Sequence, residues 1–100
     1  MKSYLITEPA SDDLNQIWDY LAETDVRLAD RILAAMEDAI RKLVKHPGLG
    51  HYRPDLTDKP LRFYLVYSYL IVYQPDTNPL EVRRVLHAAR DIENLLLRTD

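Results

Sequence analysis

RFYLVYSYLIVY, residues 62–73, is the stretch of sequence that decides the fold. Aromatic and β-branched residues are enriched in strands, so we predict two strands on either side of a turn near Ser68, folded as an antiparallel hairpin. Turn-forming residues at 75–79 follow. Beyond them, Leu80 to His87 is predicted to be a third strand of the same meander. The second half of the chain therefore predicts an antiparallel sheet.

Two amphipathic helices are predicted before this sheet. The first begins at Pro9, which suits the first turn of a helix, and ends near Thr24. Its apolar residues recur at helical spacing: Leu14, Ile17, Trp18 and Leu21. The second helix follows the capping residues Thr24 and Asp25 and continues to the stop signal at 46–48. Because few residues join the two helices, we expect an antiparallel helical hairpin.

Short elements complete the predicted order. The apolar run at 4–6 predicts a strand, and the Pro- and Gly-rich segment 47–60 predicts an irregular loop. Asp91 is predicted to cap a short C-terminal helix whose apolar residues are Ile92, Leu95 and Leu96. The predicted fold class is α+β in the order β-α-α-β-β-β-α. It is a single domain over 1–100, with the helical hairpin packed on a mainly antiparallel sheet.

Composition narrows the class of protein. One hundred residues, of which 47% are hydrophobic and 29% charged, suit one folded domain. With no cysteine, disulfides, cysteine-bound zinc and thiol nucleophiles are excluded. The apolar run at the N-terminus is too short for a signal peptide, and no later stretch is long enough for a membrane span. We therefore expect a soluble, cytoplasmic protein with no membrane partner.

Charge argues against nucleic acid as a partner. The formal net charge is −3, whereas phosphate binding needs clustered lysine and arginine. From Glu8 to Asp25 there are six acidic residues and no Lys or Arg. That surface would repel RNA or DNA, and we expect no direct sequence-specific DNA binding by this chain alone.

Several short strings in the chain occur in the order found in one family. They are the Pro9–Tyr20 helix with Asp13-Leu14, Ile17 and Tyr20, the loop opening HPGLG (46–50), Leu61-Arg62 before a strand, YLIVY (69–73) and RVLHAARDI (84–92). Together they resemble the RelE/ParE family of type II toxins, in its ParE branch of plasmid stabilisation toxins. The resemblance covers nearly the whole chain. It implies a cytoplasmic, growth-inhibiting toxin that is silenced when a cognate ParD-like antitoxin wraps an extended or helical segment over it. The resemblance is compatible both with a homo-oligomer and with a hetero-oligomer formed with the antitoxin.

The two branches of this family differ in target. RelE-like members are ribosome-dependent mRNA endonucleases, whereas ParE-like members inhibit DNA gyrase without nuclease chemistry. Aligned with the matching RelE strand, this chain has Leu70 where the nucleases place an important arginine, and Leu96 where they place a tyrosine. Of the cationic positions before that strand, at most Arg62 survives, and Arg90 matches a catalytic arginine. The resemblance therefore implies a non-catalytic gyrase inhibitor. The alternative is an mRNA endoribonuclease with a reduced site of Arg62, His87 and Arg90.

Five arginines are candidates for binding the antitoxin or the target: Arg53, Arg62, Arg83, Arg84 and Arg90. Arg62, Arg83 and Arg84 lie on predicted strands and suit an acidic partner. Because successive strand residues point to opposite faces, Arg83 and Arg84 are predicted not to share one patch.

Other notable side chains are assigned structural roles. Three of them are Trp18, His87 and Asp91. Tyr64, Tyr67, Tyr69 and Tyr73 suit core packing better than base stacking. His46, His51 and Asp55 match no known zinc spacing, so no metal and no cofactor are predicted.

Overall fold

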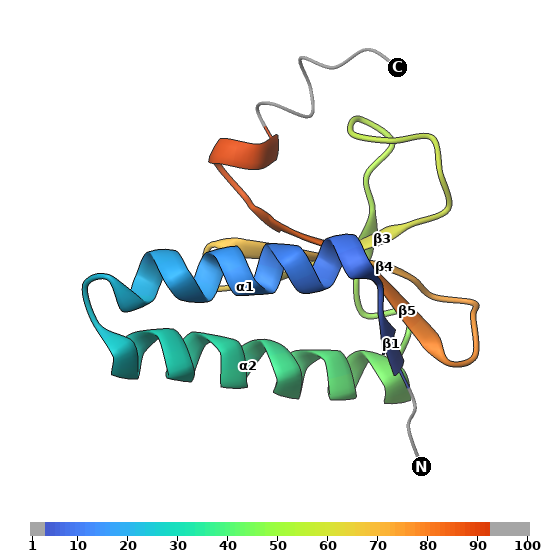
Figure 1. The fold of residues 1–100 in the computed structure, drawn as a ribbon. Coiled ribbons are helices and arrows are strands. Elements are labelled where there is room, and N and C mark those ends of the chain that lie inside the picture. Colours follow the sequence, from blue (N-terminus) through green and yellow to red (C-terminus); the bar gives the residue numbers. More distant parts are fainter. Residues whose placement is uncertain (1–3, 93–100) are drawn as a thin grey trace.

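The structure, a computed structural model, describes residues 4–92 and has an α+β fold, as predicted. Its elements are β1 (Tyr4–Ile6), α1 (Glu8–Ala22), α2 (Val26–Lys45), β2 (His51–Tyr52), β3 (Arg62–Val66), β4 (Tyr69–Gln74) and β5 (Leu80–His87). Figure 1 shows α1 and α2 side by side and antiparallel, with the strands gathered at one side of this hairpin. The predicted meander β3-β4-β5 is confirmed, including the bounds of β5.

The sheet has the strand order β1-β5-β4-β3-β2. Its pairs are antiparallel except for β1, which runs parallel to β5 with Tyr4 opposite Leu80. This pairing joins the first strand of the chain to the last. The turn between β3 and β4 contains Tyr67 at φ 53°, the left-handed region that side chains rarely adopt. Tyr69 and Tyr73 are buried, as predicted for core packing. Tyr67 is exposed in this turn, so the core position predicted for it was wrong.

The two helices are capped locally and cover one face of the sheet. The Thr7 hydroxyl accepts the Ala10 N–H at the start of α1, and Asp25 accepts the N–H groups of Arg27 and Leu28 at the start of α2. Between the helices, Trp18 Nε1 donates to Asp30 Oδ1 at 2.9 Å. The main core lies between this hairpin and the sheet, and its largest fully buried side chains are Met36, Ile40, Leu43, Ile71, Tyr73, Val82 and Val85.

A smaller apolar cluster lies on the other face of the sheet. It consists of Phe63, Leu70, Val72 and Leu86, with Leu56, Leu61, Ala88 and Ile92 packed against it. Because β4 contributes to both clusters, its first five residues are all buried rather than alternating.

The loop after α2 is fastened to the sheet by Tyr73. The phenolic oxygen donates a hydrogen bond to the Pro47 carbonyl at 2.6 Å and accepts the Gly50 N–H at 2.9 Å. A Cβ on Gly50 would lie 2.7 Å from that oxygen, closer than side chains tolerate, whereas one on Gly48 would meet nothing within 4 Å. Gly50 therefore lets the loop approach β4 closely.

Three sequence predictions need correction or lie outside the structure. The segment 47–60 is not wholly irregular, because His51–Tyr52 pairs with β3 as the short strand β2. The first helix ends at Ala22 rather than near Thr24. Of the predicted C-terminal helix, the structure describes a helical turn at 90–92, and Leu95 and Leu96 lie outside the described residues. Within residues 4–92, the helices are too short or too polar to cross a bilayer.

Candidate functional site

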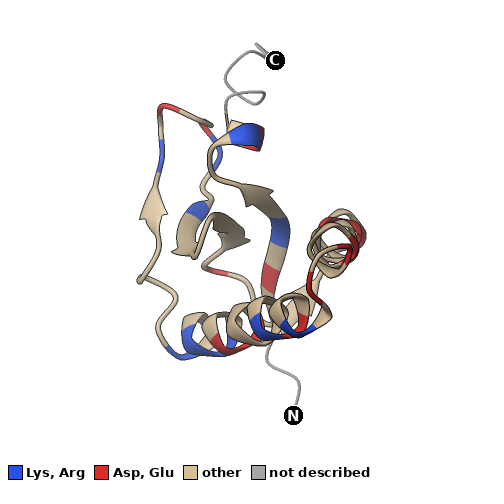
Figure 2. Cartoon of the chain, turned by 90° about the vertical axis from the view of Figure 1, so that its left-hand side faces the viewer, with Lys and Arg blue, Asp and Glu red and all other residues tan. Residues whose placement is uncertain are grey.

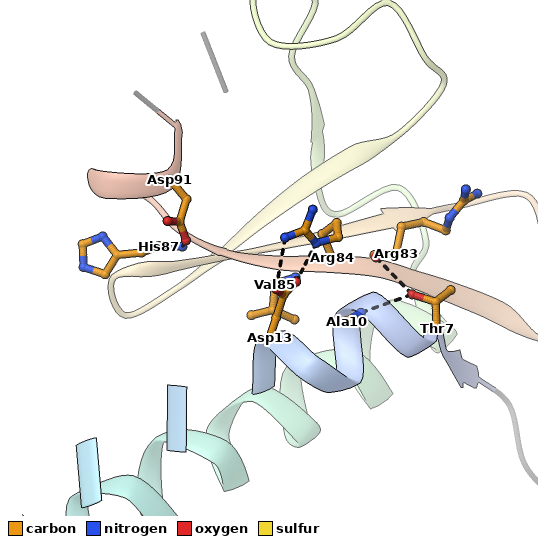
Figure 3. Close-up of polar contacts among 8 residues, drawn as sticks. All are labelled: Thr7, Ala10, Asp13, Arg83, Arg84, Val85, His87 and Asp91. Carbon is orange, nitrogen blue, oxygen red and sulfur yellow. Dashed lines mark hydrogen bonds and ion pairs between the residues drawn. The ribbon is translucent and has the colours of Figure 1, made fainter. Parts of the chain in front are cut away.

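Asp13 of α1 binds the edge of β5. β1 covers that edge at Leu80–Val82, and Asp13 meets the part beyond it. Asp13 Oδ2 accepts the Val85 N–H at 2.9 Å and Arg84 Nε at 2.7 Å, and Oδ1 accepts Arg84 Nη2 at 3.1 Å (Figure 3). The hydrogen bond to Asp13 raises the pKa of Arg84. Arg84, predicted to bind a partner, is thus held by its own chain.

Two further side chains cap the same edge of β5. Thr7 donates its hydroxyl to the Arg83 carbonyl at 3.0 Å and its N–H to the Val82 carbonyl at 3.1 Å. Asp91 Oδ2 accepts the His87 N–H at 2.7 Å. An edge strand exposes backbone groups that invite another strand, and such side-chain caps satisfy them. Neither Thr7 nor Asp13 was predicted from the sequence to make this contact.

Arg83 and Arg84 lie on the same face of the sheet, so the prediction that they cannot share a patch was wrong. The register of β5 against β4 shifts here: Tyr73 pairs with Val82 and Val72 with Arg84, which leaves Arg83 as the extra residue of a β-bulge. The bulge breaks the alternation on which the prediction rested. In Figure 3 both side chains leave β5 on the side away from α2.

His87, Arg90 and Asp91 form a hydrogen-bonded cluster at the end of β5. The His87 Nδ1 accepts the Arg90 backbone N–H at 3.1 Å, so His87, rather than the predicted Asp91, caps the turn that follows. Arg90 Nε donates to Asp91 Oδ1 at 3.1 Å. The His87 ring meets Tyr69 edge to face, with centroids 5.5 Å apart. His87, Arg90 and Asp91 thus hold one another in place at the end of β5.

The ionised carboxylate of Asp91 is predicted to make the stability of the fold sensitive to acid. Burial alone would raise the pKa of Asp91, but hydrogen bonds from the Arg90 side chain and the His87 backbone N–H, and the positive charge of Arg90, lower it overall. A lowered folded-state pKa contributes stability above the unfolded pKa, which is lost as pH falls through the folded value. We expect Asp91→Asn to reduce the free energy of unfolding at pH 7, and the deficit to shrink by pH 3. Urea unfolding at both pH values measures this, and an equal deficit at both would contradict it.

Arg62 and Arg53 are engaged elsewhere. Arg62 Nη1 donates to the Gly50 carbonyl at 2.6 Å, and the guanidinium lies 4.1 Å above the Tyr52 ring. Arg53 pairs with Asp55 at 2.8 Å on the surface. Arg62 pairs with Tyr73 at one end of β4, and His87 pairs with Tyr69 at the other end. At the usual rise of a strand, Arg62 and His87 are therefore about 13 Å apart along the strand direction. The three residues of the alternative nuclease site therefore do not converge.

The surface offers two kinds of hollow. An apolar hollow of about 300 Å³, here called the hairpin groove, lies between β1, α1 and α2 and is lined mainly by Tyr4, Ile6, Leu14, Leu33, Ala34 and Ile40. His87 and Arg90 line a second, mixed hollow of about 620 Å³ with Tyr20 and Tyr69, and Arg62 does not line it. Within residues 4–92, no three His, Asp or Glu side chains are grouped as metal ligands would be.

Comparison with known proteins identifies relatives. The family model described as ParE toxin of type II toxin-antitoxin system, parDE, matches residues 4–92. No curated protein matches the chain. Among solved structures, a chain of the chromosomal ParDE toxin-antitoxin system from P. aeruginosa is similar, with a TM-score of 0.68 and 19% sequence identity. The match covers 87% of this chain and 96% of that chain, and at this identity it shows the fold alone.

Proposed function

The chain belongs to the family of ParE toxins of type II toxin-antitoxin systems, and from this premise we propose that it arrests growth in the cytoplasm by binding DNA gyrase, without chemistry of its own. The proposal that the chain has no catalytic activity rests on one observation: Arg62 lies beside one end of β4, whereas His87 and Arg90 lie beside the other end. General acid–base cleavage of RNA needs these groups within hydrogen-bond reach of one phosphate. Leu70, at the nuclease arginine position, is buried in the smaller apolar cluster.

A supercoiling assay tests the gyrase proposal. Purified toxin, added in stoichiometric excess to gyrase and relaxed plasmid, is expected to reduce the formation of supercoiled DNA, because a surface-binding inhibitor acts in proportion to its occupancy. Full supercoiling under these conditions would contradict the proposal. Primer extension on cellular mRNA after toxin expression is the companion measurement, and ribosome-dependent cleavage products would establish the nuclease instead.

The hairpin groove is the site that best suits the antitoxin. Its lining is apolar, and amphipathic helices bind grooves of this kind through apolar anchors on one face. Glu37 at its border accepts a hydrogen bond from Tyr4 at 3.3 Å. An antitoxin segment that buried this surface would also stabilise the toxin by mass action.

Ala34→Glu tests this placement. Ala34 is exposed on α2 and lines the groove, so the folded toxin tolerates a carboxylate there, whereas a bound apolar segment would bury it. We expect antitoxin binding to weaken by roughly a hundredfold or more, since burying an unpaired charge costs several kcal/mol. Arg31→Gln, on the same helix but outside the groove, gives the same change in net charge. Equal affinities for the two variants, measured by calorimetry, would exclude the groove.

A further inference from the structure

A second groove lies on the face of the sheet opposite the helical hairpin. Two hollows of about 390 Å³ and 580 Å³ adjoin there, because Lys59, Leu61 and Arg84 line both. They run over β5 and β4, between the flank of α1 and the segment before β3. The bulge at Arg83 and Arg84 turns both side chains toward this side of the sheet. We call the combined hollow the sheet groove.

Positive charge gathers in the sheet groove. Its lining contains four cationic side chains, Lys59, Arg83, Arg84 and Arg90, and two carboxylates, Asp13 and Asp91. Glu81 lies 3.7 Å from Arg83 and is not part of the lining. The chain as a whole has a net charge of −3, and Figure 2 shows red bands without blue on α1. A local excess of cations on an acidic protein favours a negatively charged partner at this face.

The details favour a polypeptide over a nucleic acid. Arg84 and Arg90 already bind Asp13 and Asp91, and those carboxylates face the groove, where they would repel a run of phosphates. Base stacking needs exposed aromatic rings, yet the aromatic lining residue among those described, Phe63, is 4% exposed. The groove offers contacts to apolar side chains instead, because Pro60 is exposed in one hollow and Leu61 is half-buried where the two hollows meet.

We propose that the sheet groove is a second protein-binding surface, which takes a segment of a partner polypeptide that alternates acidic and apolar side chains. Lys59 and Arg83 bind its carboxylates, and Leu61 and Pro60 contact its apolar side chains. Within residues 4–92 Lys59 has no ion pair of its own, so its ammonium is available to the partner. This surface is separate from the hairpin groove, and its occupation does not depend on gyrase being the target.

A peptide-binding measurement tests the proposal. The probe is a fluorescein-labelled synthetic peptide of alternating glutamate and leucine, titrated with the full chain and followed by anisotropy. We expect saturable binding that weakens with added salt and falls by at least roughly tenfold in the double variant Lys59→Glu/Arg83→Glu. A matched double variant, Arg31→Glu/Lys45→Glu, makes the same charge change on the outer surface of α2 and is expected to retain most of the affinity. Circular dichroism spectra confirm that both fold.

Two outcomes would overturn the proposal: equal weakening in the two double variants, or tighter binding of a single-stranded oligonucleotide than of the peptide. Ala34→Glu in the hairpin groove is expected to bind the peptide as the unmodified chain does. Loss of peptide binding in that variant would place the peptide in the hairpin groove and likewise overturn the assignment.

Discussion

Gly50→Ala is expected to lower the free energy of unfolding by about 2–3 kcal/mol, which corresponds to roughly 10–20 °C in Tm for a domain of this size. The added Cβ would lie 2.7 Å from the phenolic oxygen of Tyr73 and 2.8 Å from its Cε1. Tyr73 is fully buried and has no room to retreat. The loop must therefore move away, which stretches or breaks the hydrogen bond from the Gly50 N–H to Tyr73.

Gly48→Ala is the matched control for this prediction. It lies two residues earlier in the same loop, and its Cβ would meet no atom within 4 Å. Because neither glycine has a positive φ, backbone strain does not distinguish the two substitutions. Thermal and urea unfolding of both variants give the comparison. If they lose the same stability, the close approach of the loop to Tyr73 is not what demands glycine at position 50.

Asp13→Ala is expected to cost about 2–3 kcal/mol of unfolding free energy. The substitution leaves the Val85 N–H on the strand edge without its acceptor and removes two bonds from Arg84. Most of the loss comes from the backbone bond, since Arg84 is half exposed and solvent screens its ion pair. Asp13→Asn keeps an oxygen for the Val85 N–H, so its cost should be about half as large.

Asp12→Ala provides the control for the Asp13 prediction. Asp12 is the adjacent residue of α1 and is exposed, so we expect a change within about 0.5 kcal/mol. Urea unfolding of the three variants supplies the values. Similar losses for Asp12→Ala and Asp13→Ala would show that Asp13 does not fasten α1 to β5.

Most elements were predictable because their signals are local. The bounds of β5 follow from the turn residues before it and from the end of its apolar run. The start of α2 follows from Asp25, the capping residue directly before it in the sequence. β2 was not predictable, because two residues in a Pro- and Gly-rich segment become a strand through pairing with β3. Its existence depends on where the loop lies in space.

The arrangement of the candidate site was less predictable than the fold. The alternation rule predicted Arg83 and Arg84 on opposite faces of the sheet, whereas a bulge places them on the same face. Arg62 was expected to face a partner, yet it binds loop carbonyls that lie twelve and fourteen residues away. Contacts over such distances are fixed by packing. One local signal for Asp13 existed: it precedes Leu14, so it borders the apolar stripe of α1.

The parallel pairing of β1 with β5 has a consequence for synthesis on the ribosome. The α1–α2 hairpin is built from neighbours in the chain and can form as soon as residue 45 is available, whereas β1 waits for β5, which is made nearly last. Pairing of such distant segments is the slow part of folding, because a long loop must close first. The Asp13–Arg84 contact forms in the same step. A nascent chain therefore exposes the apolar face of its helical hairpin until β5 has been made.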